Sequence, residues 1–247
     1  MKWVSGLRSI LFFAGQIPAL IFVVTTAMIL LPAPVSVRYA YLHLWARFSI
    51  RWLALTCGVK YRVHGLENID KSHPGLILAK HESAWETFAF QEFFPRQAFV
   101  LKQELLKIPF FGWGLRMMGP IAIDRAAGRK AMMQVIKQGT DKLAQGVWVV
   151  IFPEGTRTRN GKIGKLNAGG AILAQKSKAK TYLVAHNAGH CWPSGSLLMT
   201  PGVIDVYISP AIDPSELTVE EINQQLEDWL RAHLSTEKSS DKEVLQT

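Results

Sequence analysis

The chain has 247 residues, which is long enough to bury a substantial hydrophobic core and excludes disorder throughout. Only 19% of the residues are charged and the mean hydropathy is +0.12, so part of the apolar surface must face something other than water. The net charge is +9, but residues 1–212 carry 25 basic and 10 acidic side chains whereas residues 213–247 carry 3 and 9.

The N-terminal segment predicts a membrane-associated helix. No residue between Arg8 and Arg38 is charged, and residues 10–31 are almost entirely apolar. At about 1.5 Å per residue, such a helix is long enough to cross the roughly 30 Å hydrocarbon core of a bilayer. A cleaved signal peptide is the alternative, but the apolar run exceeds the usual signal core and no A-x-A-like site follows it.

A second helix of a different kind is predicted over residues 39–56. Titratable side chains recur along it every four residues among Leu, Phe and Trp: His43, Arg47 and Arg51. This pattern suits the membrane interface, whereas a nucleic-acid surface would place its basic residues on a polar face, so no nucleic-acid partner is expected. Residues 1–57 are thus predicted to be a membrane-anchoring helical hairpin. Because basic residues flank the first apolar run on both sides, insertion into one leaflet and a full crossing stay equally open.

From residue 60 the pattern changes to short β-like runs that alternate with helical segments. The seven runs are residues 61–63, 76–79, 98–101, 121–123, 147–152, 182–185 and 203–208. The clearest helices are residues 129–145, which Gly146 ends, and a closing helix capped by Thr218 and Glu221. This alternation predicts an α/β fold with a central sheet flanked by helices over residues 58–234, followed by a flexible tail at 235–247.

Several motifs of other enzyme classes are missing from the sequence. It contains no G-x-G-x-x-G, G-x-x-x-x-G-K-[ST], G-x-S-x-G or H-E-x-x-H pattern, which disfavours nucleotide, serine-hydrolase and zinc-protease chemistry. Cys57 and Cys191 are too few for a disulfide framework. Asn187 and Gly189 predict a loop between His186 and His190 rather than a helical metal site. We therefore expect no metal and no cofactor.

A candidate catalytic pair follows the predicted strand at residues 76–79. Ser83 and Glu86 match an S-x-x-E capping box, so in the simplest interpretation Glu86 only secures the first turn of a helix. In the functional interpretation, the helix returns the Glu86 carboxylate to one nitrogen of His81 and leaves the other nitrogen free to accept a proton. His81 would then act as a general base.

Arginines follow two other predicted strands. Residues 152–159 come directly after the most apolar run, and residues 119–125 again place an arginine just past a β run. Ligands of α/β proteins bind at the carboxyl ends of strands, where arginines can grip a phosphate and Glu154 can accept hydrogen bonds from hydroxyl groups. The alternative is an ordinary surface Pro-Glu-Gly turn. Taken together, the residues predict a site that deprotonates an alcohol on a phosphorylated substrate.

These blocks resemble the motifs of the glycerolipid acyltransferases. His81 to Glu86 looks like their H-x-x-x-x-[DE] motif, Asp124-Arg125 like the second motif, residues 152–157 like F-P-E-G-T-R, and residues 183–189 like the fourth. The blocks occur in family order, and the whole chain resembles the bacterial 1-acyl-sn-glycerol-3-phosphate acyltransferases. Two departures stand out: Glu86 occupies a position that is usually Asp, so that Glu82 is a conceivable substitute, and Leu183 occupies a position that is usually Pro.

The resemblance implies a membrane enzyme at the cytoplasmic face of the inner membrane. It would move a fatty acyl group from acyl-CoA or acyl-carrier protein to the sn-2 hydroxyl of the lysophospholipid acceptor lysophosphatidic acid, giving phosphatidic acid. By resemblance, His81 is the base and Glu86 orients it. The implied substrate-binding residues are Glu154, Gly155 and Thr156 around the glycerol and Lys102, Arg125 and Arg157 at the phosphate.

Several alternatives stay open at this point. The acceptor could be glycerol 3-phosphate or another lyso-lipid, and water as the acceptor would make the protein a thioesterase. A non-catalytic protein that binds anionic membrane lipid through its basic face is the alternative from a different class. The aromatic stretch at residues 108–115 could line an acyl channel, contact the membrane or belong to an ordinary core.

Overall fold

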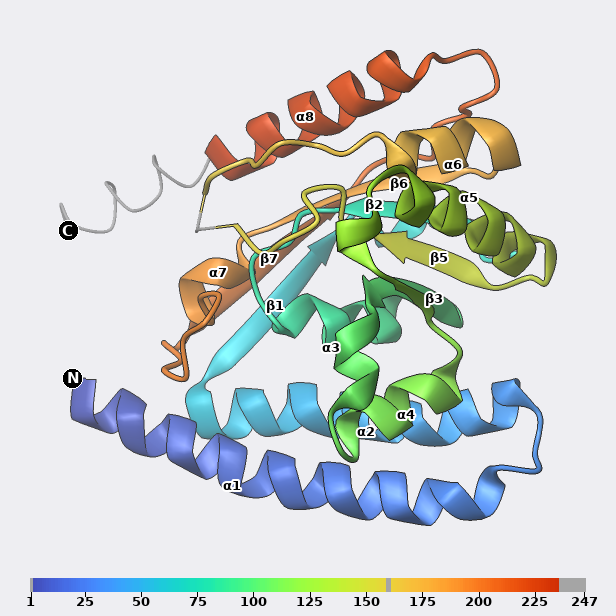
Figure 1. Cartoon of the computed structure of the whole chain (residues 1–247). Coiled ribbons are helices and arrows are strands. Elements are labelled where there is room, and N and C mark those ends of the chain that lie inside the picture. The colour runs from blue at the N-terminus through green and yellow to red at the C-terminus, as the bar shows by residue number, and fades with distance from the viewer. Residues whose placement is uncertain (1, 159–160, 236–247) are drawn as a thin grey trace, which may run out of the picture.

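The computed structural model describes residues 2–158 and 161–235, so the predicted tail lies, apart from its first residue, outside the described residues. Two long helices, α1 (Lys2–Ala27) and α2 (Val35–Cys57), form an antiparallel pair along one side of an α/β body (Figure 1). Gly58 ends α2 with a left-handed backbone, φ 69°, that turns the chain into the first strand.

The body is built on one seven-stranded sheet. Its strands are β1 (Val59–His64), β2 (Leu76–Ala79), β3 (Gln97–Lys102), β4 (Ile121–Ile123), β5 (Trp148–Ile151), β6 (Thr181–His186) and β7 (Gly202–Ile208). They lie in the order β1-β7-β6-β2-β5-β3-β4, and β6 pairs with β7 antiparallel whereas the other neighbours pair in parallel. The predicted α/β fold is confirmed, since each of the seven apolar runs forms a strand.

Helices cover both faces of this sheet. The remaining helices are α3 (Trp85–Phe93), α4 (Phe111–Met118), α5 (Arg129–Ala144), α6 (Gly169–Ser177), α7 (Ala188–Cys191) and α8 (Val219–Ser235). Side chains alternate along β2, so Ile77 packs into one core with α1, α2 and α3, while Leu76 and Leu78 pack into another with α5, α6 and α8. Because both faces of the sheet are buried, the central strands are continuous apolar runs in the sequence.

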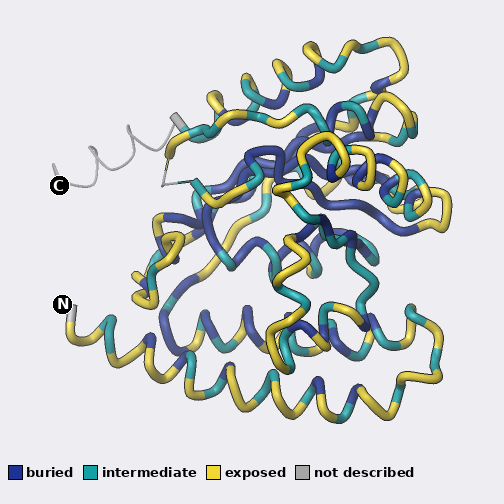
Figure 2. The backbone as a smooth tube through the Cα atoms, in the orientation of Figure 1, coloured by how far each residue is buried: buried dark blue, intermediate teal, exposed yellow. Residues whose placement is uncertain are grey.

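The α1–α2 pair is docked against the body along its inner side. Phe12 is fully buried in the core, the indole N–H of Trp52 donates to its carbonyl at 3.1 Å, and the Met199 N–H donates to Ser9 Oγ at 3.0 Å. The outer side of α1 carries exposed apolar side chains, with Trp3 93% and Leu7 70% exposed (Figure 2). The two helices therefore complete the core on one side and present an apolar surface on the other.

Among the described residues, one helical stretch, Trp3–Leu30, is long and apolar enough to cross a membrane. Its most apolar window has a mean hydropathy of 2.0, and 22% of that window is buried inside the protein. Most of this stretch thus faces away from the core, unlike the central helix of a water-soluble domain.

Candidate active site

Two sequence motifs meet at the carboxyl edge of the sheet because β2 and β5 are parallel neighbours. The His81–Glu86 segment connects β2 to α3, and the segment from Phe152 to Arg157 follows β5. The His81 ring stacks on the Phe152 ring, with 4.1 Å between the ring centroids and 14° between the planes. The sheet topology alone thus brings together residues that are about 70 positions apart in the chain.

His81 and Glu86 form a close pair. The Nδ1 atom of His81 lies 2.7 Å from Glu86 Oε1, and the same oxygen accepts the N–H groups of Glu82 and Ser83, each at 3.0 Å. Glu86 is fully buried, whereas His81 keeps 9% of its surface exposed. This geometry holds Nδ1 and leaves Nε2 as the ring nitrogen available to a substrate.

The pKa of the Glu86 carboxyl lies below its ordinary value. Burial acts to raise this pKa, but the hydrogen bond with His81, the nearby His186 and the Ser83 N–H together outweigh burial and lower it. Glu86 is therefore held as a carboxylate beside the imidazole. The Glu86 Oε1 atom accepts the Ser83 N–H, as expected of a capping box, and also contacts the His81 imidazole, as expected of a catalytic pair. Both interpretations of the Ser-x-x-Glu pattern therefore describe part of the geometry.

Glu82, the alternative partner of His81, is directed elsewhere. Its carboxylate accepts the Gly161 N–H at 3.1 Å and the Gly189 N–H at 3.2 Å. The carboxylate that contacts His81 is therefore that of Glu86 and not that of Glu82.

A buried ion pair lies directly behind His81. Lys80 is fully buried, and its Nζ donates to both carboxylate oxygens of Glu154, at 2.9 and 3.0 Å, and to Thr158 Oγ1. Glu154 also accepts the His81 N–H at 3.0 Å and the Gly164 N–H at 2.7 Å. Glu154 is 6% exposed, and its carboxylate oxygens accept all of these hydrogen bonds, so its role at the glycerol stays a prediction.

Sequence reasoning missed Lys80 and Thr158. The available signal was a lysine at the end of an otherwise wholly apolar strand, because a buried lysine requires a buried carboxylate. Nothing in the sequence identified that carboxylate as Glu154.

Replacing Lys80 with methionine is expected to destabilise the protein by about 3–5 kcal/mol, because the Glu154 carboxylate would lose its buried counter-charge. A second substitution, Glu154→Gln, should recover part of this loss, since it neutralises the nearer of the two buried carboxylates that face Lys80 Nζ, Glu154 at 2.9 Å and Glu82 at 3.5 Å. The measurement is chemical unfolding in detergent of the two single variants and the double variant. Additive losses in the double variant would contradict a direct pairing.

The predicted phosphate-binding residues divide into two groups. Arg157 and Arg125 line the same cavity as His81, and Arg125 also donates to the Gly155 carbonyl. Burial lowers the pKa of the Arg125 guanidinium, and the negative charge of Glu104 partly offsets this effect. Lys102 is exposed at the end of β3, outside the residues that line this cavity, and Thr156 is likewise exposed and outside that lining.

The cavity beside His81 is narrow and mostly apolar. Its volume is about 140 Å³, and its walls come from α2, α3, α4 and β3. Of the aromatic stretch at residues 108–115, Phe111 and Leu115 line it, whereas Trp113 is 40% exposed. The site therefore places the His81 imidazole, the Arg125 and Arg157 guanidinium groups and apolar side chains around one cavity.

His186, considered above as a metal ligand, is engaged by the backbone. Its Nε2 lies 2.9 Å from the Lys80 carbonyl, and its Nδ1 accepts the Ala188 N–H at 3.3 Å. Over residues 2–158 and 161–235, no group of three or more His, Cys, Asp or Glu side chains is placed to hold a metal ion.

Comparisons with known proteins identify the family of this chain. The sequence model of the family described as Acyltransferase matches residues 60–189. A 1-acyl-sn-glycerol-3-phosphate acyltransferase of Pseudomonas aeruginosa is 40% identical over 93% of this chain and 91% of its own length. One from Borreliella burgdorferi is 29% identical over 76% of this chain and 75% of its own length.

A solved structure shows the same fold. The crystal structure of the 1-acyl-sn-glycerophosphate acyltransferase from Thermotoga maritima superposes with a TM-score of 0.78 at 24% identity, covering 96% of this chain and 98% of that chain. The family match spans both motifs that form the site, and the Pseudomonas relative extends the likeness over nearly the whole chain. The chain therefore belongs to the acyltransferase family.

Proposed function

We propose that the protein transfers a fatty acyl group from an acyl thioester to the sn-2 hydroxyl of lysophosphatidic acid, giving phosphatidic acid. The observation that carries this proposal is the His81–Glu86 pair, with the free face of the imidazole and Arg157 lining one apolar cavity. Relatives that are 1-acyl-sn-glycerol-3-phosphate acyltransferases support the choice of acceptor.

The mechanism follows from the orientation of His81. Its Nε2 takes the proton of the acceptor hydroxyl while the hydroxyl oxygen attacks the thioester carbonyl. When the C–S bond breaks, the imidazolium returns that proton to the thiolate, and the products are the ester and a free thiol. Glu86 stabilises the imidazolium in between. No covalent enzyme intermediate is needed, and Cys57 and Cys191 are both buried.

The function is tested by thiol release from acyl-CoA and from acyl-carrier protein, each with lysophosphatidic acid, glycerol 3-phosphate, another lysophospholipid or no acceptor. We expect release that depends on lysophosphatidic acid and yields phosphatidic acid. Release without any acceptor would instead identify a thioesterase, and no release with any pair would favour a non-catalytic lipid-binding protein.

Arg157 is proposed to bind the phosphate of the acceptor. Replacing Arg157 with alanine removes a charge-assisted hydrogen bond worth about 1.5–3 kcal/mol, so the KM for lysophosphatidic acid should rise roughly 10- to 150-fold. The KM for the donor should change less than about twofold, since the donor acyl chain occupies the apolar part of the cavity. Steady-state kinetics with each substrate varied in turn separates the two effects, and equal rises in both KM values would remove the phosphate role.

The α1–α2 pair is proposed to hold the enzyme on the cytoplasmic face of the inner membrane. Insertion into one leaflet is favoured over a crossing because α1 is docked against the body, where Ser9 contacts Met199 and Phe12 contacts Trp192. If α1 crossed the membrane, these contacts and the neighbouring loop at Met199 would have to lie inside the bilayer. The helices cannot be deleted as a test, since Phe12, Ile50 and Leu53 belong to the main core.

Membrane binding is better tested on the exposed face of α1. Each large apolar side chain contributes about 1.5–3 kcal/mol when it leaves water, so the double variant Leu7→Glu, Phe22→Glu should weaken binding to vesicles by at least about 100-fold. The matched control is Met133→Glu on α5, which exposes 49% of its surface on the opposite side of the sheet. Unchanged co-sedimentation of the double variant with vesicles would show that the anchor lies elsewhere.

A further inference from the structure

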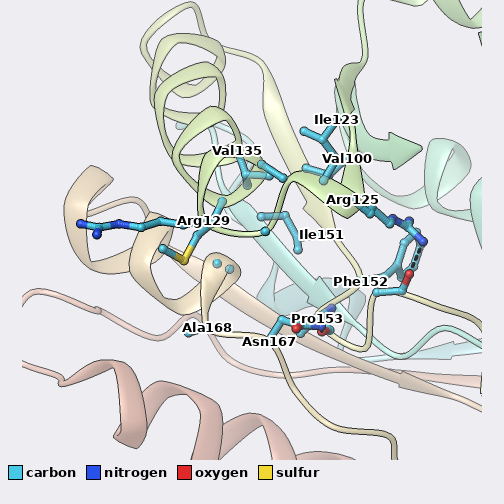
Figure 3. Close-up of a pocket in the computed structure, with 16 residues that line it drawn as sticks. Val100, Ile123, Arg125, Arg129, Val135, Ile151, Phe152, Pro153, Asn167 and Ala168 are labelled. Carbon is cyan, nitrogen blue, oxygen red and sulfur yellow. Dashed lines mark hydrogen bonds between the residues drawn. The ribbon is translucent and has the colours of Figure 1, made fainter. Parts of the chain in front are cut away.

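A second cavity lies on the other side of the sheet edge and has no role in the mechanism above. Its volume is about 380 Å³, and it opens between the first turns of α5 and α6, at the carboxyl ends of β3, β4 and β5 (Figure 3). Its walls are mainly apolar, formed by Val100, Ile123, Ala131, Met132, Val135 and Ile151. The volume falls in the range of small-molecule sites, about 300–1,000 Å³.

This cavity adjoins the active site. Val100, Arg125 and Phe152 line both cavities, so these residues form the wall between them. His81 stacks on that same Phe152 ring. An extended molecule that crosses the Phe152 edge would therefore place one end in each cavity and its middle next to the imidazole.

An acyl thioester is such a molecule, since it carries an acyl chain on one side of the reacting carbonyl and a pantetheine arm on the other. The first cavity is walled by Leu42 and Trp45 of α2, next to the apolar surface that faces the membrane, and suits the acyl chain. The second cavity is walled by α5 and α6, on the opposite side of the sheet from α1 and α2 (Figure 1). It therefore opens toward the water from which a thioester carrier arrives.

The charge at the rim of the second cavity fits the phosphate that ends a pantetheine arm. Arg125 and Arg129 are the charged side chains among the described residues that line it. They lie at opposite sides of the cavity, with Arg125 turned toward Gly155 and Arg129 extending outward from the start of α5 (Figure 3). The N-terminal turns of α5 and α6 add N–H groups at the same rim, which also favour an anion.

We propose, resting on the function given above, that this second cavity receives the phosphopantetheine arm of the acyl donor. The arm lies between α5 and α6, its phosphate meets Arg129 at the rim, and its thioester reaches the Phe152 edge beside His81. Coenzyme A and acyl-carrier protein share this arm, so the proposal concerns their common chemistry.

Gly169 allows the cavity to be filled from α6. A Cβ atom built on Gly169 would lie 3.8 Å from Met132 Cγ, an ordinary contact across the space between α6 and α5. Gly169→Leu should therefore narrow the cavity and raise the donor KM at least about tenfold. Gly169→Ala is the matched control, because it tests the loss of glycine while filling almost none of the space.

The role of Arg129 is tested by comparing its alanine variant with that of the adjacent Lys130. Arg129→Ala should raise the donor KM by about three- to tenfold, the value of one exposed charge-assisted contact. Lys130→Ala removes the same charge from the same helical turn but from a residue outside the cavity lining, and should change the donor KM by less than about twofold. Thermal unfolding of all four variants, compared with the wild-type protein, checks that each is folded.

The kinetics are measured with acyl-CoA and with acyl-carrier protein bearing the same chain, first with the donor varied at saturating lysophosphatidic acid and then with lysophosphatidic acid varied at saturating donor. A higher KM for both donors, or for one donor alone, supports the proposal and in the second case names the carrier. An unchanged donor KM in folded Gly169→Leu, or a rise confined to the acceptor KM, would overturn it. Failure of the proposed function is distinguishable, because the wild-type protein would then release no thiol in response to the acceptor.

Discussion

Replacing His81 with alanine is expected to lower the rate of acyl transfer by at least about 100-fold, the lower end of what a positioned general base contributes. The acceptor hydroxyl would then have to lose its proton to water, and the departing thiolate would have no imidazolium to protonate it. The KM values for both substrates should change little, since the cavity walls and the arginines are untouched.

The fold should survive this substitution. Glu86 would keep the N–H groups of Glu82 and Ser83 as hydrogen-bond donors, so its buried carboxylate would not be left without partners. The matched control is His73→Ala, which removes a histidine whose side chain is 72% exposed. The readout is phosphatidic acid formed per unit time by folded protein. If the His81 variant kept a tenth of the wild-type rate, the base assignment would be wrong.

The sequence predicted the sheet well because the relevant signal is local. Strands buried on both faces must be continuously apolar, and residues 76–79 and 148–151 show this directly. The closing helix was equally predictable, since Thr218 and Glu221 exchange the hydrogen bonds of a capping box at 2.7 and 3.2 Å. In both cases, the residues that determine the element are neighbours in the chain.

The site was only partly predictable because its supporting contacts are distant in the chain. The His81–Glu86 spacing fits within one turn and one helix start, so the pair could be proposed from the sequence. The Lys80–Glu154 pair joins residues 74 positions apart and depends on β2 and β5 being neighbours, which periodicity does not reveal. For the same reason, the arginine motif alone could not show that Glu154 is turned inward whereas Arg157 lines the cavity.

The orientation of the N-terminal helical pair could likewise be predicted only in part. Its composition predicted an apolar hairpin, and the exposed face of α1 agrees with that prediction. Composition could not show which apolar residues face the protein, because most positions of α1 are apolar and the periodicity is weak. The contacts of Phe12 with the Trp52 indole and the Trp192 ring decide this orientation.

Replacing Glu86 with glutamine is expected to lower the acyl-transfer rate by about 10²- to 10⁴-fold, because the side chain keeps its shape but loses the charge that stabilises the imidazolium. The variant Glu86→Asp distinguishes the effect of the negative charge from the effect of side-chain length. Aspartate keeps the charge but is one methylene shorter than a side chain that now contacts His81 Nδ1 at 2.7 Å, so its rate should fall between those of wild type and the glutamine variant. The matched control is Glu92→Gln, on the same helix but paired with His43 and Arg47 instead of His81.

The lowered pKa of Glu86 also predicts how Glu86→Gln changes the stability of the protein in acid. A carboxyl group with a lower pKa in the folded state stabilises the fold above its unfolded-state pKa, and this contribution is lost as the pH falls through the folded-state pKa. The free energy of unfolding of the wild-type protein should thus fall more steeply below about pH 4.3, the ordinary glutamate pKa, than that of Glu86→Gln. Denaturant unfolding at a series of pH values measures both slopes. If the two proteins lost stability equally steeply as the pH falls, the contacts of Glu86 with His81 and the Ser83 N–H would not be what keeps the Glu86 carboxylate ionised. The same contacts could then not stabilise an imidazolium during acyl transfer.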